Sequence, residues 1–175
     1  VPVYANQTAT TCSGTALSVT PTGTTVPAGT QFTWTVVDNP DVTGEAANAT
    51  AASTFSANLV NTSNTAQTVV YTLTPIAGTC AGASFTMTVT VDPTPSVTAQ
   101  TATICSATSF SVTPANGSGN IVPSGTTYSW SAPSVTGITG AASGTSAAAI
   151  SGTLVNTTNA PIDVTYTVTP TAGSC

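Results

Sequence analysis

The sequence predicts an all-β fold in which two antiparallel β-sandwiches follow one another. Apolar and polar residues alternate over several short segments, which is the period of a strand with one buried face. The sequence also repeats itself: the offset between matching residues is 93 from Cys12 to Cys105 and 96 from Trp34 to Trp130. No segment shows helical periodicity, so we expect strands and turns alone.

The alternation is clearest in residues 85–91 and 162–169, where Phe, Met, Val, Ile or Tyr takes every second place and Thr or Asp most of the others. One polar and one apolar face per strand is typical of antiparallel sheets that pack one face inward. Turn residues such as Pro, Gly and Asn separate the segments. Further strands are expected around 17–19, 32–36, 55–59, 110–112, 128–131 and 150–154.

The internal repeat predicts two domains, residues 1–93 and 94–175. The first copy continues beyond Cys80 into the strand at 85–91, whereas the second stops at Cys175, so we expect the second domain to lack its last strand. We interpret the segment as a window from a longer array, in which the prolines of 93–95 form a stiff link. Matching pairs include Pro21 and Pro114, Asn61 and Asn156, Tyr71 and Tyr166, and Cys80 and Cys175.

Each repeat is typical of an Ig-like sandwich, with six or seven short strands in about 93 residues and a tryptophan on a central strand. Trp34 and Trp130 each stand within an alternating apolar set, so we expect them in the cores. Exposed platforms for stacking sugars are the less favoured interpretation. Tyr71 and Tyr166 are also expected to fill the cores, with a corner-type hydrogen bond as the alternative.

The four cysteines favour disulfides and an oxidising compartment. Zinc is disfavoured because no CxxC pair and no His is present. The simplest pairing lies within each repeat, Cys12 with Cys80 and Cys105 with Cys175, although four cysteines allow three pairings. A bond closing a loop of that length contributes about 4 kcal/mol in the chain-entropy model.

The composition excludes several classes of function. The chain has no Lys, Arg or His, so it cannot neutralise nucleic-acid phosphates or anionic lipid headgroups. No apolar run is long enough for a membrane helix. Catalysis lacks a base or an activated nucleophile, so we expect neither an enzyme nor a cofactor. Asp38, Asp41 and Glu45 are a weak Ca²⁺ candidate that the second copy lacks, and a solvated loop is the favoured interpretation.

The motifs Phe-Ser-Val-Thr-Pro, Leu-Val-Asn-Thr and Tyr-Thr-Val-Thr-Pro-x-Ala-Gly-x-Cys complete the pattern. The whole chain resembles the PKD-like repeats of very large Bacteroidetes cell-surface proteins, such as gliding-motility adhesins of the SprB type exported by type IX secretion. The resemblance implies an Ig-like sandwich, an extracellular position at the cell surface, and a role as stalk or adhesive filament. Expected partners are neighbouring repeats, surface polysaccharides or other surface proteins. The alternatives are a carbohydrate-binding accessory module of a secreted hydrolase and a filament subunit that assembles by strand donation.

Overall fold

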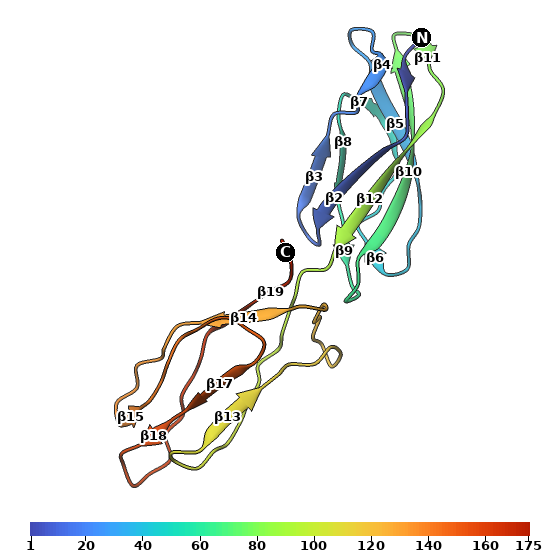
Figure 1. Cartoon of the computed structure of the whole chain (residues 1–175). Coiled ribbons are helices and arrows are strands. Elements are labelled where there is room, and N and C mark those ends of the chain that lie inside the picture. The colour runs from blue at the N-terminus through green and yellow to red at the C-terminus, as the bar shows by residue number, and fades with distance from the viewer. The chain divides into compact units, whose positions relative to one another are not determined.

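The computed structural model describes residues 1–175, and all of its regular secondary structure is β-strand (Figure 1). The chain divides into two compact units, Val1–Thr94 and Pro95–Cys175. The predicted all-β fold is confirmed, and no helix is present that could cross a membrane.

The first unit contains one large sheet whose strands follow the order β2-β12-β10-β5-β7. A two-residue strand, β11, pairs with the far end of β10. The strands of this sheet are β2 (Gln7–Cys12), β5 (Gln31–Val37), β7 (Asn48–Ala52), β10 (Gln67–Ala77), β11 (Cys80–Ala81) and β12 (Phe85–Asp92).

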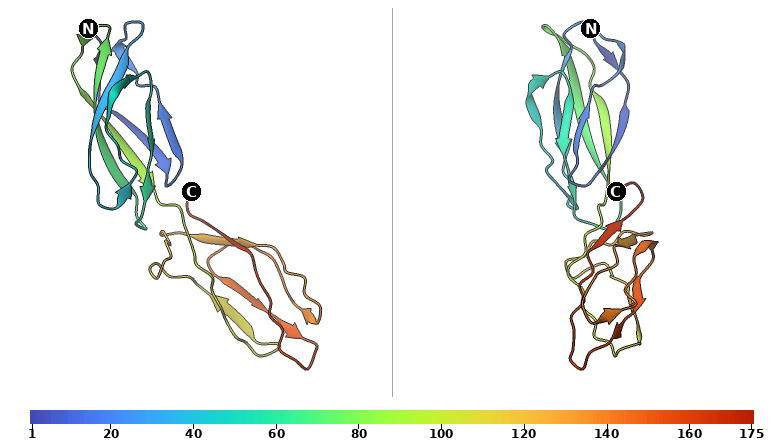
Figure 2. Two further views of the ribbon diagram at one scale, coloured as in Figure 1. Left: turned by 180° about the vertical axis from the view of Figure 1, so that it is seen from behind. Right: turned by 90° about the vertical axis from the view of Figure 1, so that its left-hand side faces the viewer.

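Three short antiparallel pairs contribute the rest of the first unit, and Figure 2 shows its strands from two sides. Phe55 and Leu59, from the part of the chain that holds β8, are buried in one cluster with the β10 residues Val69, Tyr71 and Leu73. The apolar faces of both layers therefore meet in a single core. The pairs are β1 (Val3–Tyr4) with β4 (Gly23–Thr25), β3 (Ala16–Val19) with β8 (Phe55–Asn58), and β6 (Val42–Thr43) with β9 (Val60–Asn61).

Strand β12 shows how the sequence pattern sets the packing. Its apolar residues Phe85, Met87, Val89 and Val91 are all 3% exposed or less, while the threonines between them are partly exposed. Successive side chains of a strand point to opposite faces, so the alternation puts every apolar residue of β12 into the core. Full burial of such side chains contributes roughly 1.5–3 kcal/mol each.

The sheet is not purely antiparallel, which corrects the prediction. Strand β2 runs parallel to β12, with Gln7 opposite Met87 and Cys12 opposite Asp92. Strand β2 comes early in the unit and β12 is its last strand. Both run in the same direction through the sandwich. The chain therefore enters the unit at an entrance end, near Val3 and β11, and leaves it beyond Asp92 at an exit end (Figure 1).

The second unit repeats two of the three short pairs and has a smaller sheet, β16-β14-β19. Its buried core consists of Tyr128, Trp130 and Ile150, with partly buried residues such as Phe110 and Val168 against them. Its strands are β13 (Ser109–Val112), β14 (Thr127–Trp130), β15 (Ile138–Thr139), β16 (Gly144–Ala147), β17 (Ile150–Thr153), β18 (Val155–Asn156) and β19 (Val168–Thr171). Outside the sheet, β13 pairs with β17 and β15 with β18.

The strand predicted at 162–169 forms only in part, because β19 begins at Val168. In the first unit the matching part of β10 pairs with β12 on one side and with β5 on the other. Within the 175 residues the second unit has no counterpart of β12. On the other side β14 ends at Trp130, and Pro133, three residues on, has no N–H to extend the ladder. Residues 100–105, which match β2, form no strand for the same lack of a partner.

Candidate functional site

Both tryptophans lie in the cores and not on the surface. Trp34 is 6% exposed and Trp130 is 8% exposed. The Trp34 Nε1–H donates to the Ala46 carbonyl at 3.2 Å, and the Trp130 Nε1–H donates to the Ala142 carbonyl at 3.0 Å. Each indole satisfies its single donor within its own unit, and because both rings are buried, neither offers a face for stacking a sugar.

Tyr4, the first aromatic residue of the chain, is partly buried against the core of the first unit. Its ring centroid lies 5.2 Å from that of Phe32 and 5.2 Å from that of Phe85. The large apolar side chains that remain exposed are all valines. The structure therefore shows no row of exposed aromatic rings of the kind a carbohydrate-binding module uses.

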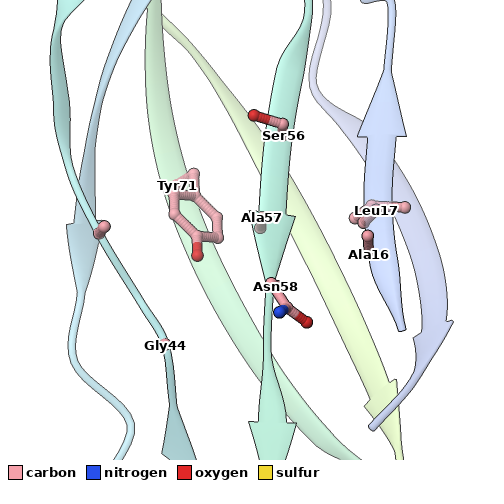
Figure 3. A pocket seen from close by; sticks show the side chains of 8 residues that line it. Ala16, Leu17, Gly44, Ser56, Ala57, Asn58 and Tyr71 are labelled. Atoms are coloured by element: carbon pink, nitrogen blue, oxygen red, sulfur yellow. The ribbon is translucent and has the colours of Figure 1, made fainter. Parts of the chain in front are cut away.

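Tyr71 is fully buried beside a shallow depression of about 340 Å³ in the first unit (Figure 3). Its hydroxyl has no hydrogen-bond partner, so the corner-type bond is absent. Burial, with a smaller effect from the Glu45 carboxylate, raises the pKa of Tyr71 to about 12. The phenol stays protonated at neutral pH and supplies no base. The depression is otherwise lined by small or neutral side chains: Ala16, Leu17, Gly44, Ala46, Ser56, Ala57 and Asn58.

Tyr166, the matching residue in the second unit, is only partly buried and packs against the smaller core there. Its ring centroid lies 5.8 Å from that of Phe110. Burial raises the pKa of Tyr166 as well. Its larger exposure follows from the missing counterpart of β12, which covers Tyr71 in the first unit through Met87.

Tyr71→Phe is expected to reduce the amount by which the free energy of unfolding of the first unit falls at alkaline pH. The unfolded tyrosine loses its proton near pH 10, whereas the folded one keeps it to about pH 12. The unfolded state therefore binds fewer protons in that window, and stability falls as the pH rises from about 10 to 12. Urea unfolding at pH 8 and pH 11 measures the effect. Tyr4→Phe is the control, and an equal pH dependence in Tyr71→Phe and the parent would contradict the assignment.

The weak Ca²⁺ candidate finds no support, since its three acidic residues do not form a group that could hold a metal ion. A Glu45 carboxylate oxygen accepts the Asn39 backbone N–H at 3.1 Å, and burial, helped by the charge of Asp38, raises the pKa of Glu45 against this bond. Asp41 acts through its backbone, since its carbonyl accepts both the N–H and the hydroxyl of Thr62. The Glu45 carboxylate and the Asp41 carbonyl thus belong to the hydrogen bonding of a loop.

The disulfides expected within the repeats are also absent, because Cys80 and Cys105 are free, exposed thiols. In the first unit Cys12 lies opposite Asp92 at the exit end, where β10 begins at Gln67. Cys80 lies opposite Ala77 at the other end of β10. That strand is 11 residues long, or about 33 Å, whereas a disulfide needs Cα atoms within about 7 Å. The predicted pairing was therefore wrong. Neither repeat gains the stabilisation of about 4 kcal/mol that a disulfide within the repeat would contribute.

Asn61, which the repeat matches with Asn156, has a buried structural role that the sequence did not predict. Asn61 is 1% exposed. Its side-chain amide donates to the carbonyls of Thr65 and Val91, each at 2.8 Å, and its oxygen accepts from the Ser63 N–H and hydroxyl. The Ser13 hydroxyl accepts the Asn61 backbone N–H at 2.9 Å. These hydrogen bonds link three segments of the chain at the exit end of the unit. In the sequence, the only indication of this role is the Leu-Val-Asn-Thr motif present in both copies.

Asn61→Ala is expected to lower the stability of the first unit by about 2–4 kcal/mol, because the buried Val91 carbonyl loses its donor and the bond to Thr65 is lost as well. Asn156→Ala is the matched control. Its amide donates to the Ala160 carbonyl at 2.7 Å and the residue is partly exposed, so water can replace what is lost. Urea unfolding followed by fluorescence, with only Trp34 or only Trp130 retained, separates the units. Equal losses in both variants would contradict the proposed role.

Both repeats match one protein family. The sequence matches the PKD-like domain family over residues 9–95 and again over 102–175. A search of curated proteins found no match. PKD-like domains are Ig-like, generally non-catalytic and typically extracellular, which indicates a structural or adhesive repeat module. Since the two matches cover most of the 175 residues, the chain belongs to the PKD-like domain family and contains two copies of its β-sandwich.

Proposed function

We propose that this chain is a non-catalytic stalk or adhesive segment of a long extracellular adhesin or filament at a bacterial cell surface. Its partners are neighbouring repeats of the same chain, together with surface polysaccharides or other surface proteins. The motifs that resemble repeats of gliding-motility adhesins support export by the type IX route. The absence of Lys, Arg and His speaks against nucleic acid and anionic lipid as partners.

The observation that carries this proposal is the position of the two chain ends in the first unit. Val3 and Tyr4 pair with β4 at the entrance end, and the chain leaves after Asp92 at the exit end, beside Cys12. A domain with its ends on opposite sides adds its whole length to a chain of repeats. A domain whose ends lie together adds almost none. The parallel pairing of β2 with β12 is therefore the geometry that a spacer needs.

The outer surface also suits a spacer. Outward positions of the large sheet hold neutral threonines, for example Thr35, Thr72 and Thr86 in one row across β5, β10 and β12. Such a surface is polar without cations, and the net charge of −5 keeps equal segments apart. These features favour long, soluble arrays over self-association.

The two alternatives find less support. A carbohydrate-binding module lacks its aromatic platform, as described above. Strand donation between subunits would need a strand free to leave, whereas β12 pairs with β10 and β2 and buries its four apolar side chains in its own unit. If the intact chain bound to a glycan array at micromolar affinity, the carbohydrate-binding module would become the favoured function in place of the stalk.

A deletion in the source bacterium tests the proposal. Removing residues 12–104 joins Thr11 to Cys105 and takes out one period of the repeat. We expect antibodies against the folded chain to label intact cells of the parent and of the deletion strain, with surface fibres one repeat shorter in the latter. Labelling of lysates but not of intact cells would contradict the surface position, and unchanged fibre length would contradict the spacer role.

A further inference from the structure

The cysteines of each repeat occupy opposite ends of its sandwich. In the first unit Cys12 lies at the exit end and Cys80 in β11 at the entrance end, about 33 Å apart along β10. Figure 1 shows β11 beside the N-terminus and the end of β2 at the far side of the same unit. Neither cysteine can reach the other, so each can bond only with a cysteine outside its own repeat.

The second unit places its cysteines in the same way. The carbonyl of Cys105 accepts the Thr108 N–H at 3.1 Å, just as that of Cys12 accepts the Thr15 N–H at 3.0 Å. Cys175 follows β19, whose last residue Thr171 pairs with Thr127 at the start of β14. Each repeat therefore has one exit-end cysteine, Cys12 or Cys105, and one entrance-end cysteine, Cys80 or Cys175.

Both positions are suited to disulfide formation. Cys12 and Cys175 are in the disulfide-bonded state, whereas their counterparts Cys105 and Cys80 are exposed free thiols. Each position thus occurs once oxidised and once reduced. Cys80 and Cys105, the two reduced cysteines, are exposed, so an oxidant and a partner thiol can reach each sulfur.

We propose that Cys80 and Cys105 form disulfides with cysteines of further copies of this repeat in the same chain, Cys80 with an exit-end cysteine and Cys105 with an entrance-end cysteine. The inference rests on the proposed function, because it requires a series of repeats. In such a series the exit end of one copy is followed by the entrance end of the next. A link as short as Pro93-Thr94-Pro95 keeps two such thiols at high effective concentration.

The reaction is a two-electron oxidation. Two thiols lose two protons and two electrons as the S–S bond forms, and a disulfide oxidant such as oxidised glutathione takes them up and becomes two thiols. The resulting bonds would cross-link each junction without constraining the inside of a repeat.

A chain of two copies tests the proposal. It consists of residues 1–175, then 81–93 to supply the missing strand, then 1–175 again, with Cys80→Ser in the first copy and Cys105→Ser in the second. One Cys80 and one Cys105 then remain. After oxidation with glutathione, alkylation and chymotryptic digestion without reduction, we expect mass spectrometry to show a Cys105–Cys80 peptide. Thiols that both remain alkylated, or Cys80 bonded to Cys12, would overturn the proposal.

The source of the partner is tested with separate chains. Equal amounts of Cys80→Ser and Cys105→Ser variants of the 175-residue chain are oxidised together at micromolar concentration. We expect less than a tenth of the cross-linking found in the two-copy chain. Efficient dimers from separate chains, with none of the bond in the two-copy chain, would overturn the assignment to the same chain. Failure of this bond leaves surface labelling unaffected, so the two proposals fail separately.

Discussion

Val89→Asp is expected to unfold the first unit at room temperature. Val89 is fully buried in the middle of β12, where it lies opposite Val69 of β10 and Ala9 of β2. The substitution removes apolar contacts and puts a carboxylate into a core without a cation to pair with it, since the chain has no Lys, Arg or His. The cost exceeds about 4 kcal/mol, a large part of the stability of a small domain.

Thr88→Asp is the matched control for that substitution. Thr88 is the neighbouring residue on the same strand, it points to the outer face, and it is partly exposed. We expect a change within about 0.5 kcal/mol, as for ordinary surface substitutions. Trp34 fluorescence and urea unfolding compare the two variants in a Trp130→Phe background. A Val89→Asp chain that unfolds at the same urea concentration as Thr88→Asp would contradict the described core.

Adding residues 81–94 after Cys175 is expected to raise the thermal midpoint of the second unit by at least about 10 °C. The added segment carries the apolar alternation of β12 and can pair with both 161–167 and 100–105, which form no strand in the present chain. Four apolar side chains and their neighbours would leave water, which outweighs the cost of ordering one strand. Calorimetry, with Trp130 fluorescence to identify the unit, measures the shift.

The control for the added strand is the same extension with Asp in place of the valine copied from Val89. It should leave the midpoint of the second unit where it is, because a charged strand cannot enter an apolar core. Amide hydrogen exchange provides an independent measurement: protection should appear in residues 162–167 only with the unaltered extension. Equal midpoints for both extensions would show that the second unit does not accept this strand.

The strands were largely predictable because their signal is local. A period of two over 85–91 predicts which side chains face inward, whatever the partner strand, and β12 follows that pattern without exception. The same reasoning succeeded for Leu17, Phe55 and Ile150, which lie in β3, β8 and β17. It failed at 162–167, where the side-chain pattern is equally good but the backbone has no partner on either side. A strand forms only where its backbone can pair with a neighbouring strand, and the periodicity of a segment does not show whether such a neighbour exists.

The candidate sites depended on distances that the sequence does not contain. Cys12 and Cys80 look like a natural pair, one in each half of a repeat, yet the parallel run of β2 along β12 carries Cys12 to the exit end and away from Cys80. Asp38, Asp41 and Glu45 are close in sequence but form no metal-binding group. The structural role of Asn61 was not predicted, because a buried polar residue has no periodic signature. Only its bonds to Thr65 and Val91 reveal its role.

The sequence by itself determined the fold class, the duplication and the lack of cationic side chains, since all three follow from the identity and spacing of residues along the chain. The tertiary structure alone decided which ends of the sandwich the cysteines occupy, where the chain enters and leaves, and which backbone groups Asn61 satisfies. The physical reason is that these properties arise from strand order and direction. Strand order is settled by packing between segments as distant as Gln7–Cys12 and Phe85–Asp92.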